Sequence, residues 1–405
     1  MYLTHLSLTN FRTFTRLDID LPRRILLLVG ANAQGKTSLL EAVYYLATFS
    51  SFQAQYDRQL VSFLAGSESL AVARLVANYQ RDERAHRLEA RLIQESSGNG
   101  NVRFRKEILL DGVKKSPVEA MGHFNAVIFL PQMTRIFENG PEERRRYLNL
   151  AISQAMPGYA QALNEYNQAL TQRNALLKQL AERGGDASQL CYWDEILSQR
   201  GAIIIQGRIK AIQEIEKLAA RIHHQLTHTQ EVLRIIYQPA YDPLLPPEGQ
   251  YSLQLQTTIL RNNFTINQIQ QGFLERLTAI RNEEIARGVT TCGPHRDEMR
   301  FLSNGIDLSD YGSRGQIRTV LLALKLAEVN WLKEKTGQWP VLLLDEILVE
   351  LDTQRRADLL EYLGDCEQAL LTTTDLKLFS DEFVQQSAIW EVAGGRVREA
   401  KKGAE

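Results

Sequence analysis

The stretch Gly30-Ala31-Asn32-Ala33-Gln34-Gly35-Lys36-Thr37 matches the pattern G-x-x-x-x-G-K-[ST] at every fixed position. It follows the apolar run Ile25–Val29, which predicts a buried parallel strand, and precedes Ser38–Thr48, which predicts a helix. A glycine-rich turn in this context presents backbone N–H groups and a helix N-terminus to phosphate. We therefore predict that residues 30–38 bind a nucleoside triphosphate, with Lys36 on the β- and γ-phosphates and Thr37 as a Mg²⁺ ligand.

Composition sets the class of protein but gives no function. The chain has 405 residues, of which 44% are hydrophobic and 23% charged, with a formal net charge of −1. A nucleic-acid site would therefore have to be a local basic patch. The three cysteines are far apart in the sequence, which favours thiols in a reducing compartment over disulfides or a zinc site. No secretory leader and no apolar run of about 18 residues is visible, so we expect a cytosolic protein.

The N-terminal and C-terminal portions both carry strand patterns. Alternating apolar residues from Leu6 to Leu21 predict a β-meander, with a turn near Thr9-Asn10, that leads into the strand at Ile25. Asp111-Gly112 and Asn304-Gly305 each predict a hairpin turn. Farther on, a helix that begins after Ser313 ends near Gly337 and Pro340, Val341–Leu344 predicts a buried strand, and Leu370-Leu371 opens another.

The middle of the chain is helical. Apolar residues recur at helical spacing from Tyr159 to Leu180 and again from Trp193 to Leu226, with a break at residues 184–186. A helical hairpin follows from this pattern, and a further helix is predicted around Leu255–Ile280. The fold class is therefore α/β, with a mixed sheet, an N-terminal antiparallel β-subdomain and an inserted helical lobe. We predict two ATPase halves, residues 1–135 and 276–405, on either side of a helical lobe at 136–275.

Two carboxylates follow the strand Val341–Leu344 directly. The carboxyl end of a parallel strand is where ligands bind in open α/β sheets. Asp345 is predicted to complete the Mg²⁺ site that Thr37 begins, and Glu346 to orient or deprotonate the attacking water. The alternative for such a pair alone is a solvated turn, but the phosphate loop in the same chain favours the catalytic interpretation.

A second helix start has the chemistry of an anion site. Ser313-Arg314-Gly315-Gln316 precedes a helix, Ser313 lies at the expected N-cap, and Gly315 permits close backbone approach. The alternative is a plain N-cap with no ligand. Two phosphate-binding helix starts in one chain suggest that this one contacts the nucleotide of a partner subunit.

Phosphate loop, S-x-G-Q signature and Asp-Glu strand occur in this order in ATP-binding-cassette ATPases. Within that class the whole chain closely resembles the RecF family of bacterial recombinational repair. The resemblance is carried by the following stretches: Leu8–Arg12, Pro131, Gly140–Arg145, Gln172–Asn174, Trp193-Asp194, Gly293–Asp297 and Ser313–Glu328.

The resemblance assigns further roles by position. Gln132 matches the glutamine loop that links Mg²⁺ to the helical lobe, and Glu350 and Asp352 match the dimer-contact loop. Family members usually have Ser where this chain has Val349, which puts one hydroxyl contact to the partner in doubt. Thr374 stands where transporters carry a γ-phosphate-sensing histidine, which fits slow ATP hydrolysis.

The resemblance also implies a function and partners. These are ATP-dependent homodimerisation, clamping of gapped or junction DNA, weak DNA-dependent ATPase activity, cooperation with RecR and RecO, and assistance to RecA loading. Replication-fork recovery and the SOS response follow from the same likeness, as does a nucleoid-associated cytoplasmic location.

Basic residues that could contact DNA form two groups. One is the predicted hairpin, with a local charge of about +3 over residues 103–115, and the other begins at Arg144. The hairpin residues are Arg103, Arg105, Lys106, Lys114 and Lys115. The alternative for both groups is a solvated face, which is what runs of charge usually are. His295 has two interpretations as well, a functional residue or a structural histidine in a turn.

Three other functions remain as alternatives. A chromosome-organising ATPase of the SMC type would carry long heptad arrays between its ATPase halves, and the insertion here is a short hairpin. In a transporter's nucleotide subunit, the signature follows the phosphate loop much sooner than it does here. An ATPase-coupled nuclease needs a further acidic metal domain, for which the chain leaves no room.

Overall fold

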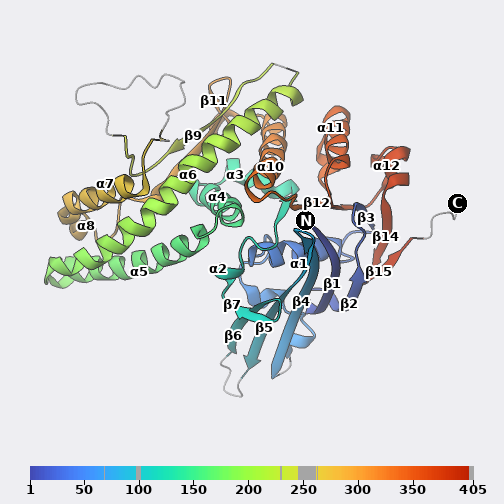
Figure 1. Cartoon of the computed structure of the whole chain (residues 1–405), viewed down its shortest axis with the longest axis horizontal. Helices are drawn as coiled ribbons and strands as arrows, with labels where there is room; N and C mark the ends of the chain where they lie inside the picture. The colour runs from blue at the N-terminus through green and yellow to red at the C-terminus, as the bar shows by residue number, and fades with distance from the viewer. Residues whose placement is uncertain (68, 97–101, 229, 245–260, 262, 401–405) are drawn as a thin grey trace. The chain divides into compact units, whose positions relative to one another are not determined.

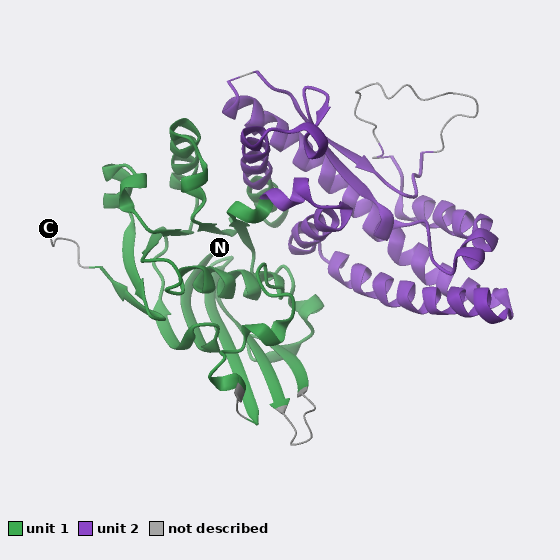
Figure 2. Ribbon diagram, turned by 180° about the vertical axis from the view of Figure 1, so that it is seen from behind, with its two compact units in different colours: residues 1–133, 328–405 green, residues 134–327 purple. Residues whose placement is uncertain are grey.

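The computed structural model describes residues 1–67, 69–96, 102–228, 230–244, 261 and 263–400. They divide into two compact units, Met1–Met133 with Glu328–Glu405, and Thr134–Ala327 (Figure 2). The second boundary differs from the predicted one, because residues 276–327 group with the inserted unit rather than with the second ATPase half. The reason is that the strands and helices of 276–327 pair and pack with elements of the helical insertion.

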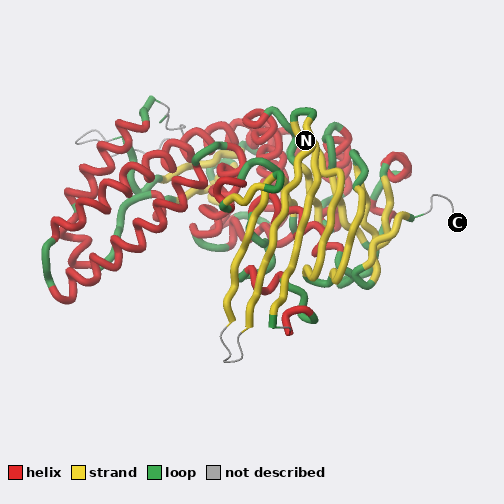
Figure 3. Tube along the Cα trace, turned by 60° about the horizontal axis from the view of Figure 1, so that its bottom comes forward, coloured by secondary structure: helices red, strands yellow, loops and turns green. Residues whose placement is uncertain are grey.

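The described part of the first unit contains two six-stranded sheets (Figures 1 and 3). The antiparallel sheet has the order β2-β1-β4-β5-β6-β7, and the second has the order β15-β14-β3-β13-β12-β8. The antiparallel strands are β1 (Tyr2–Phe11), β2 (Phe14–Asp20), β4 (Leu70–Arg81), β5 (Arg84–Ser96), β6 (Val102–Leu110) and β7 (Val113–Lys115). The others are β3 (Ile25–Val29), β8 (Ala126–Phe129), β12 (Val341–Asp345), β13 (Ala369–Thr373), β14 (Ala388–Ala393) and β15 (Arg396–Glu399). The predicted mixed sheet and antiparallel β-subdomain are thus confirmed.

Helix α1 (Lys36–Thr48) lies between these sheets. It contacts β8, β12 and β13 of one sheet and β4 and β5 of the other. From Leu39 to Thr48 every residue is buried, which is the burial expected of a helix covered on opposite sides. The other α-helices described in this unit are α2 (Pro117–Ala120), α11 (Thr353–Gly364) and α12 (Asp381–Gln386), together with the end of α10 (Arg314–Thr336).

The structure confirms the first hairpin of the predicted meander but not its continuation into β3. β1 and β2 form the expected hairpin, but β1 continues past Asn10 to Phe11, so the turn, Arg12-Thr13, comes three residues later than predicted. β3 does not extend the meander, because it pairs in parallel with β13 and β14 of the other sheet. Its uninterrupted apolar sequence suits a sheet covered on both faces, whereas the alternating β1 and β2 have one solvated face.

The second unit is built on the predicted helical hairpin, α5 (Tyr159–Arg183) and α6 (Leu190–Leu226). α7 (Ile266–Ala279) is shorter than predicted, and the earlier part of the prediction, residues 255–260, lies outside the described residues. A strand that the sequence did not suggest, β9 (Leu233–Gln238), pairs with β10 (Glu298–Ser303), which turns at Asn304-Gly305 into β11 (Ile306–Asp307). The other helices are α3 (Arg135–Glu138), α4 (Pro141–Ala155), α8 (Arg281–Arg287), α9 (Leu308–Tyr311) and the start of α10 (Arg314–Thr336).

Two arginines that are fully buried organise the second unit. Arg173 Nε donates to Asp194 Oδ1 at 2.7 Å, which ties α5 to α6. Arg208 Nη1 donates to Asp297 Oδ2 at 2.6 Å, which ties α6 to the segment before β10. Buried charges are tolerated when they are paired in this way. These contacts give the family-typical residues at 173, 194 and 297 a structural role.

His295 also belongs to this interior. Its Nδ1 lies 2.7 Å from the Tyr166 hydroxyl, and its Nε2 lies 3.1 Å from the Thr290 carbonyl oxygen. Burial lowers the pKa of His295 to about 4, so the ring is neutral at pH 7. The structural interpretation of this histidine is favoured.

We expect this histidine to make the unit less stable in acid. Because its pKa is near 6.5 in the unfolded chain and about 4 in the folded chain, the unfolded state binds more protons between those values. The free energy of unfolding should fall by about 2 kcal/mol from pH 7 to pH 5. Urea titrations at both pH values test this, with His295→Gln as the comparison. An equally steep pH dependence in His295→Gln would assign the loss to other groups.

None of the described helices combines the length and the apolar composition needed to cross a membrane.

Candidate nucleotide-binding site

The phosphate loop joins β3 to α1, as predicted, and its two glycines are required for different reasons. A Cβ at Gly30 would lie 2.3 Å from the carbonyl oxygen of Val392 in β14, so this position needs glycine for close packing. Gly35 has a φ of +109°, a conformation that other residues rarely adopt, and it is the N-cap of α1. Only Gly35 therefore requires glycine because of its backbone conformation.

Lys36 is folded back over this loop. Its Nζ donates to the carbonyl oxygens of Gly30 at 2.5 Å and Ala31 at 3.2 Å. It also forms an ion pair at 3.0 Å with Oε1 of Glu346, and the lysine side chain is only 4% exposed. The phosphate-loop lysine and the carboxylate predicted to act on water are therefore direct neighbours.

Thr37 and Asp345 meet as predicted. Thr37 Oγ1 donates to the Asp345 carboxylate, with 3.0 Å to either oxygen. Thr372, at the register position opposite Asp345 in β13, donates to Asp345 Oδ1 at 2.7 Å and accepts the backbone N–H of Glu346 at 3.0 Å. Thr372 thus holds both acidic residues in place, although no sequence motif marks this residue.

The oxygen atoms of Thr37 and Asp345 fit a Mg²⁺ ion. Mg²⁺ prefers carboxylate, hydroxyl and phosphate oxygens together with water, and this pair supplies the first two. Burial raises the pKa of Asp345, while hydrogen bonds from Thr372 and Thr37 act in the opposite direction. A divalent cation would favour the ionised carboxylate that burial disfavours.

Glu346 has an unusual backbone. Its φ of 49° and ψ of 20° are left-handed, and it is the N-cap of the short helix η6 (Ile347–Glu350). A residue other than glycine in this region costs roughly 1–3 kcal/mol, and such strain concentrates at functional sites. The left-handed turn directs the chain away from the strand directly after Asp345.

Sheet order explains why segments far apart in the sequence converge. β3, β13, β12 and β8 are adjacent and parallel, so the residues after their carboxyl ends share one edge of the sheet. Thr374, which is exposed, follows β13, and Gln132, which is partly exposed, follows β8 in η3 (Pro131–Thr134). Both predicted residues therefore lie on the same edge as the phosphate loop, and their roles stay predictions.

The C-terminal hairpin also supports the phosphate loop. The turn between β14 and β15 donates the N–H of Gly394 to Gln34 Oε1 at 2.7 Å and the N–H of Gly395 to Gln34 O at 3.2 Å. No sequence motif marks this contact, because Gly394-Gly395 resembles any hairpin turn.

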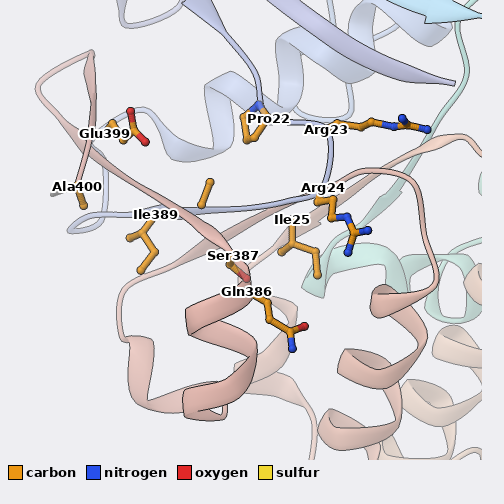
Figure 4. Close-up of a pocket in the computed structure, with 10 residues that line it drawn as sticks. Pro22, Arg23, Arg24, Ile25, Gln386, Ser387, Ile389, Glu399 and Ala400 are labelled. Atoms are coloured by element: carbon orange, nitrogen blue, oxygen red, sulfur yellow. The ribbon is translucent and has the colours of Figure 1, made fainter. Parts of the chain in front are cut away.

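Two cavities adjoin β3 or the phosphate loop. One of about 650 Å³ is lined in part by Arg12, Thr13 and Ser38, so it opens beside the loop. The other, of about 610 Å³, lies at the beginning of β3 around Arg24, Ile25 and Gln386 (Figure 4). Because β3 runs from this second cavity toward the loop, the second cavity lies at the wrong end of the strand to hold the phosphates.

The signature belongs to the second unit. Ser313 Oγ accepts the N–H of Gln316 at 3.2 Å, and Gln316 Oε1 accepts the N–H of Ser313 at 3.1 Å. This reciprocal capping box confirms the predicted N-cap at the start of α10. Ser313, Arg314 and Gly315 are exposed, and contact with a second subunit stays a prediction.

The predicted dimer loop precedes α11. Asp352 Oδ1 accepts the N–H of Arg355 at 2.9 Å, so Asp352 caps this helix. That N–H holds the pKa of Asp352 below its ordinary value. Glu350 is partly exposed, and Val349, which replaces the usual serine, is 59% exposed.

The basic hairpin is largely neutralised within the unit. Lys106 Nζ lies 2.6 Å from Asp57 and donates to the carbonyl oxygen of Phe49 at 3.0 Å. Arg105 pairs with Glu95 at 3.3 Å, and Lys114 with Glu107 at 3.0 Å. Arg103 and Lys115 form no ion pair with residues that the structure describes, so the predicted DNA contact rests on fewer charges than the sequence suggested.

Arg144 does not fit its predicted role as a DNA contact. Its Nε and Nη2 donate to the two carboxylate oxygens of Glu298 at 2.7 and 2.8 Å, and Nη1 donates to the carbonyl oxygens of Ile136 and Asn139. The residue is buried, and this guanidinium ties α4 to β10. A basic run in the sequence does not reveal which of its residues turns inward.

We expect Arg144→Ala to lower the free energy of unfolding by about 3–5 kcal/mol, because Glu298 would lose its charge partner. Arg103→Ala, at an exposed position, is the matched control and should change stability little. Urea titration measures both. A stable Arg144→Ala variant with weakened DNA binding would restore the original prediction.

Comparisons with known proteins show the family of this chain. The model of the RecF/RecN/SMC N terminal domain matches residues 2–394. The DNA replication and repair protein RecF of Chloroflexus aurantiacus is 36% identical over 98% of this chain and 99% of its own length. RecF of an Exiguobacterium species is 34% identical over the same shares of the two chains.

Solved structures are also similar to this chain over nearly its whole length. The structure titled as the recombination mediator protein RecF-ATP in the RecFOR pathway matches with a TM-score of 0.81 and 31% identity, covering 98% of this chain and 97% of that one. An SMC head bound to the C-winged helix domain of ScpA matches with a TM-score of 0.50 and 14% identity, covering 99% and 98%. The second likeness concerns the fold alone.

Proposed function

Because the chain belongs to the RecF family of DNA replication and repair proteins, we propose that it is an ATP-dependent DNA-binding protein of recombinational repair. The observation that carries this proposal is the convergence of Lys36, Thr37, Asp345 and Glu346 at one edge of a parallel sheet. Four side chains from two distant segments form the donor and acceptor set that a nucleoside triphosphate requires.

Each residue of this set has a distinct task. Lys36 exchanges its carbonyl and carboxylate partners for the β- and γ-phosphates of ATP. Thr37 and Asp345 would hold Mg²⁺, with Gln132 near the same edge, and the ion would neutralise phosphate charge. Glu346, released from Lys36, accepts a proton from the attacking water. Thr374 contacts the γ-phosphate, and its hydroxyl senses that group less strongly than a histidine would, which fits slow hydrolysis.

The ATP-bound form is proposed to be a homodimer. Ser313, Arg314, Gly315 and Gln316 of one subunit would close on the nucleotide of the other, with Glu350 and Asp352 at the contact. The exposed capping box at Ser313 supports this arrangement, since an N-terminal helix end favours phosphate. The dimer would clamp DNA at gaps or junctions, and hydrolysis would release it. Cooperation with RecR and RecO, and through them RecA loading, is supported by the relatives placed in the RecFOR pathway.

A short SMC-like chromosome-organising ATPase is the weaker alternative. Its support is the distant likeness to an SMC head, which reflects a shared fold. The helical hairpin turns back between Arg183 and Leu190, so it provides no long coiled-coil arm.

Sedimentation of the full chain tests the proposal. We expect a monomer without nucleotide, a dimer with ATP and Mg²⁺, and tighter association with gapped DNA in ATP than in ADP. Lys36→Ala should remain monomeric throughout, because it removes the ammonium that binds phosphate. DNA binding of equal strength with and without ATP would contradict the switch.

A further inference from the structure

One carboxylate outside the signature contacts it directly. Glu231, in the segment between α6 and β9, accepts a hydrogen bond from Gln316 Nε2 on its Oε1 at 3.3 Å. Its other oxygen, Oε2, accepts the hydroxyl of Ser303 at 2.7 Å and lies 3.6 Å from Nε2 of the buried His223. Glu231 therefore joins the end of β10 to the start of α10, within the second unit.

This contact fixes both ends of the Gln316 side chain. Its Oε1 accepts the N–H of Ser313, and its Nε2 donates to Glu231. An amide can be turned over to exchange its oxygen and nitrogen, and only one orientation satisfies both contacts. A carboxylate accepts and never donates, so Glu231 selects the orientation that presents the Gln316 oxygen to Ser313.

We propose that Glu231 is a positioning residue for the signature. By holding Gln316, it keeps the capping box closed and the Ser313 hydroxyl in place for the nucleotide of the opposite subunit. This inference rests on the proposed function, because it assumes that the signature acts across a dimer. It adds a residue that no motif identifies, since Glu231 is far from Ser313 in the sequence.

The simplest test compares Glu231→Ala with Glu182→Ala, an exposed glutamate on α5. Glu231→Ala should weaken ATP-dependent dimerisation and lower hydrolysis, each by about tenfold, which is the effect of one hydrogen bond to a charged group. ATP affinity of a single subunit, measured in the Ser313→Arg background, should not change because the phosphate loop is untouched. Glu182→Ala should behave like the parent in every assay.

A charge exchange decides the question even if Glu231→Ala folds poorly. Gln316→Glu places two carboxylates together, so it should weaken dimerisation by about tenfold or more. Adding Glu231→Gln restores one donor and one acceptor across the contact, with the amide now on the other side. Dimerisation of the double variant should return to within about threefold of the parent.

The outcomes separate the inference from the function on which it rests. Recovery in the double variant supports the positioning role. Dimerisation of the double variant as weak as that of Gln316→Glu, or normal dimerisation of a folded Glu231→Ala, overturns it. Suppose that one of the two contradicting results is obtained while Ser313→Arg abolishes dimerisation in the same assay. The shared-site model then stands, and only the role of Glu231 falls. If Ser313→Arg also dimerises normally, both fall.

Discussion

Glu346→Gln should lower ATP turnover by about 10²–10⁴-fold, the usual contribution of a general base. The amide keeps the shape of the carboxylate but cannot take a proton from water. ATP binding should persist, because Lys36, Thr37 and Asp345 keep their positions. The variant also loses the ion pair between Lys36 and Glu346. The Glu346 carboxylate then no longer competes with phosphate for the Lys36 ammonium.

A dimer trapped by ATP is the visible consequence of that change. Light scattering should show Glu346→Gln as a dimer long after the parent has returned to monomer, and DNA complexes in ATP should last correspondingly longer. Glu361→Gln, exposed on α11, is the matched control. Parent-like turnover in Glu346→Gln would show that another residue activates the water.

The sequence predicts the phosphate site well because its determinants are local. Strand, turn, helix start and ammonium all lie within residues 25–48, so their relation is set by neighbouring backbone. The link between Thr37 and Asp345 spans most of the chain, yet chemistry predicts it, since Asp345 ends one apolar strand and Thr37 lies in the helix start that follows another.

The features that the sequence does not predict depend on contacts between segments that are far apart in the chain. Thr372 is one of three adjacent threonines, and only the register of β13 against β12 shows that it reaches Asp345 and Glu346. Arg144 lies in a basic segment, and no neighbouring residue indicates that its side chain turns inward to Glu298. The sequence does not predict β9, because β9 is a single alternating run that follows a long helix. Its partner strand, β10, begins about 60 residues later in the chain.

The sequence predicts the signature both as a helix cap and as half of a site shared between two subunits, and the structure of one chain confirms the cap. Ser313→Arg separates these possibilities. A large cation at the exposed helix start should abolish ATP-dependent dimerisation, and with it hydrolysis and ATP-dependent DNA binding. ATP binding to one subunit should remain, because residues 30–38 are unaltered. Equilibrium titration with a fluorescent ATP analogue and light scattering measure the two properties independently.

Mixing Ser313→Arg with Lys36→Ala sharpens the test. By itself, neither variant should hydrolyse ATP. Ser313→Arg lacks a working signature, and Lys36→Ala lacks bound nucleotide. A heterodimer contains one composite site made from the intact phosphate loop of the first and the intact signature of the second. We expect partial ATPase activity on mixing, at most half that of the parent dimer if its two sites act independently. If Ser313→Arg alone dimerises in ATP and hydrolyses it at the parent rate, Ser313 is only an N-cap and the clamp model is wrong.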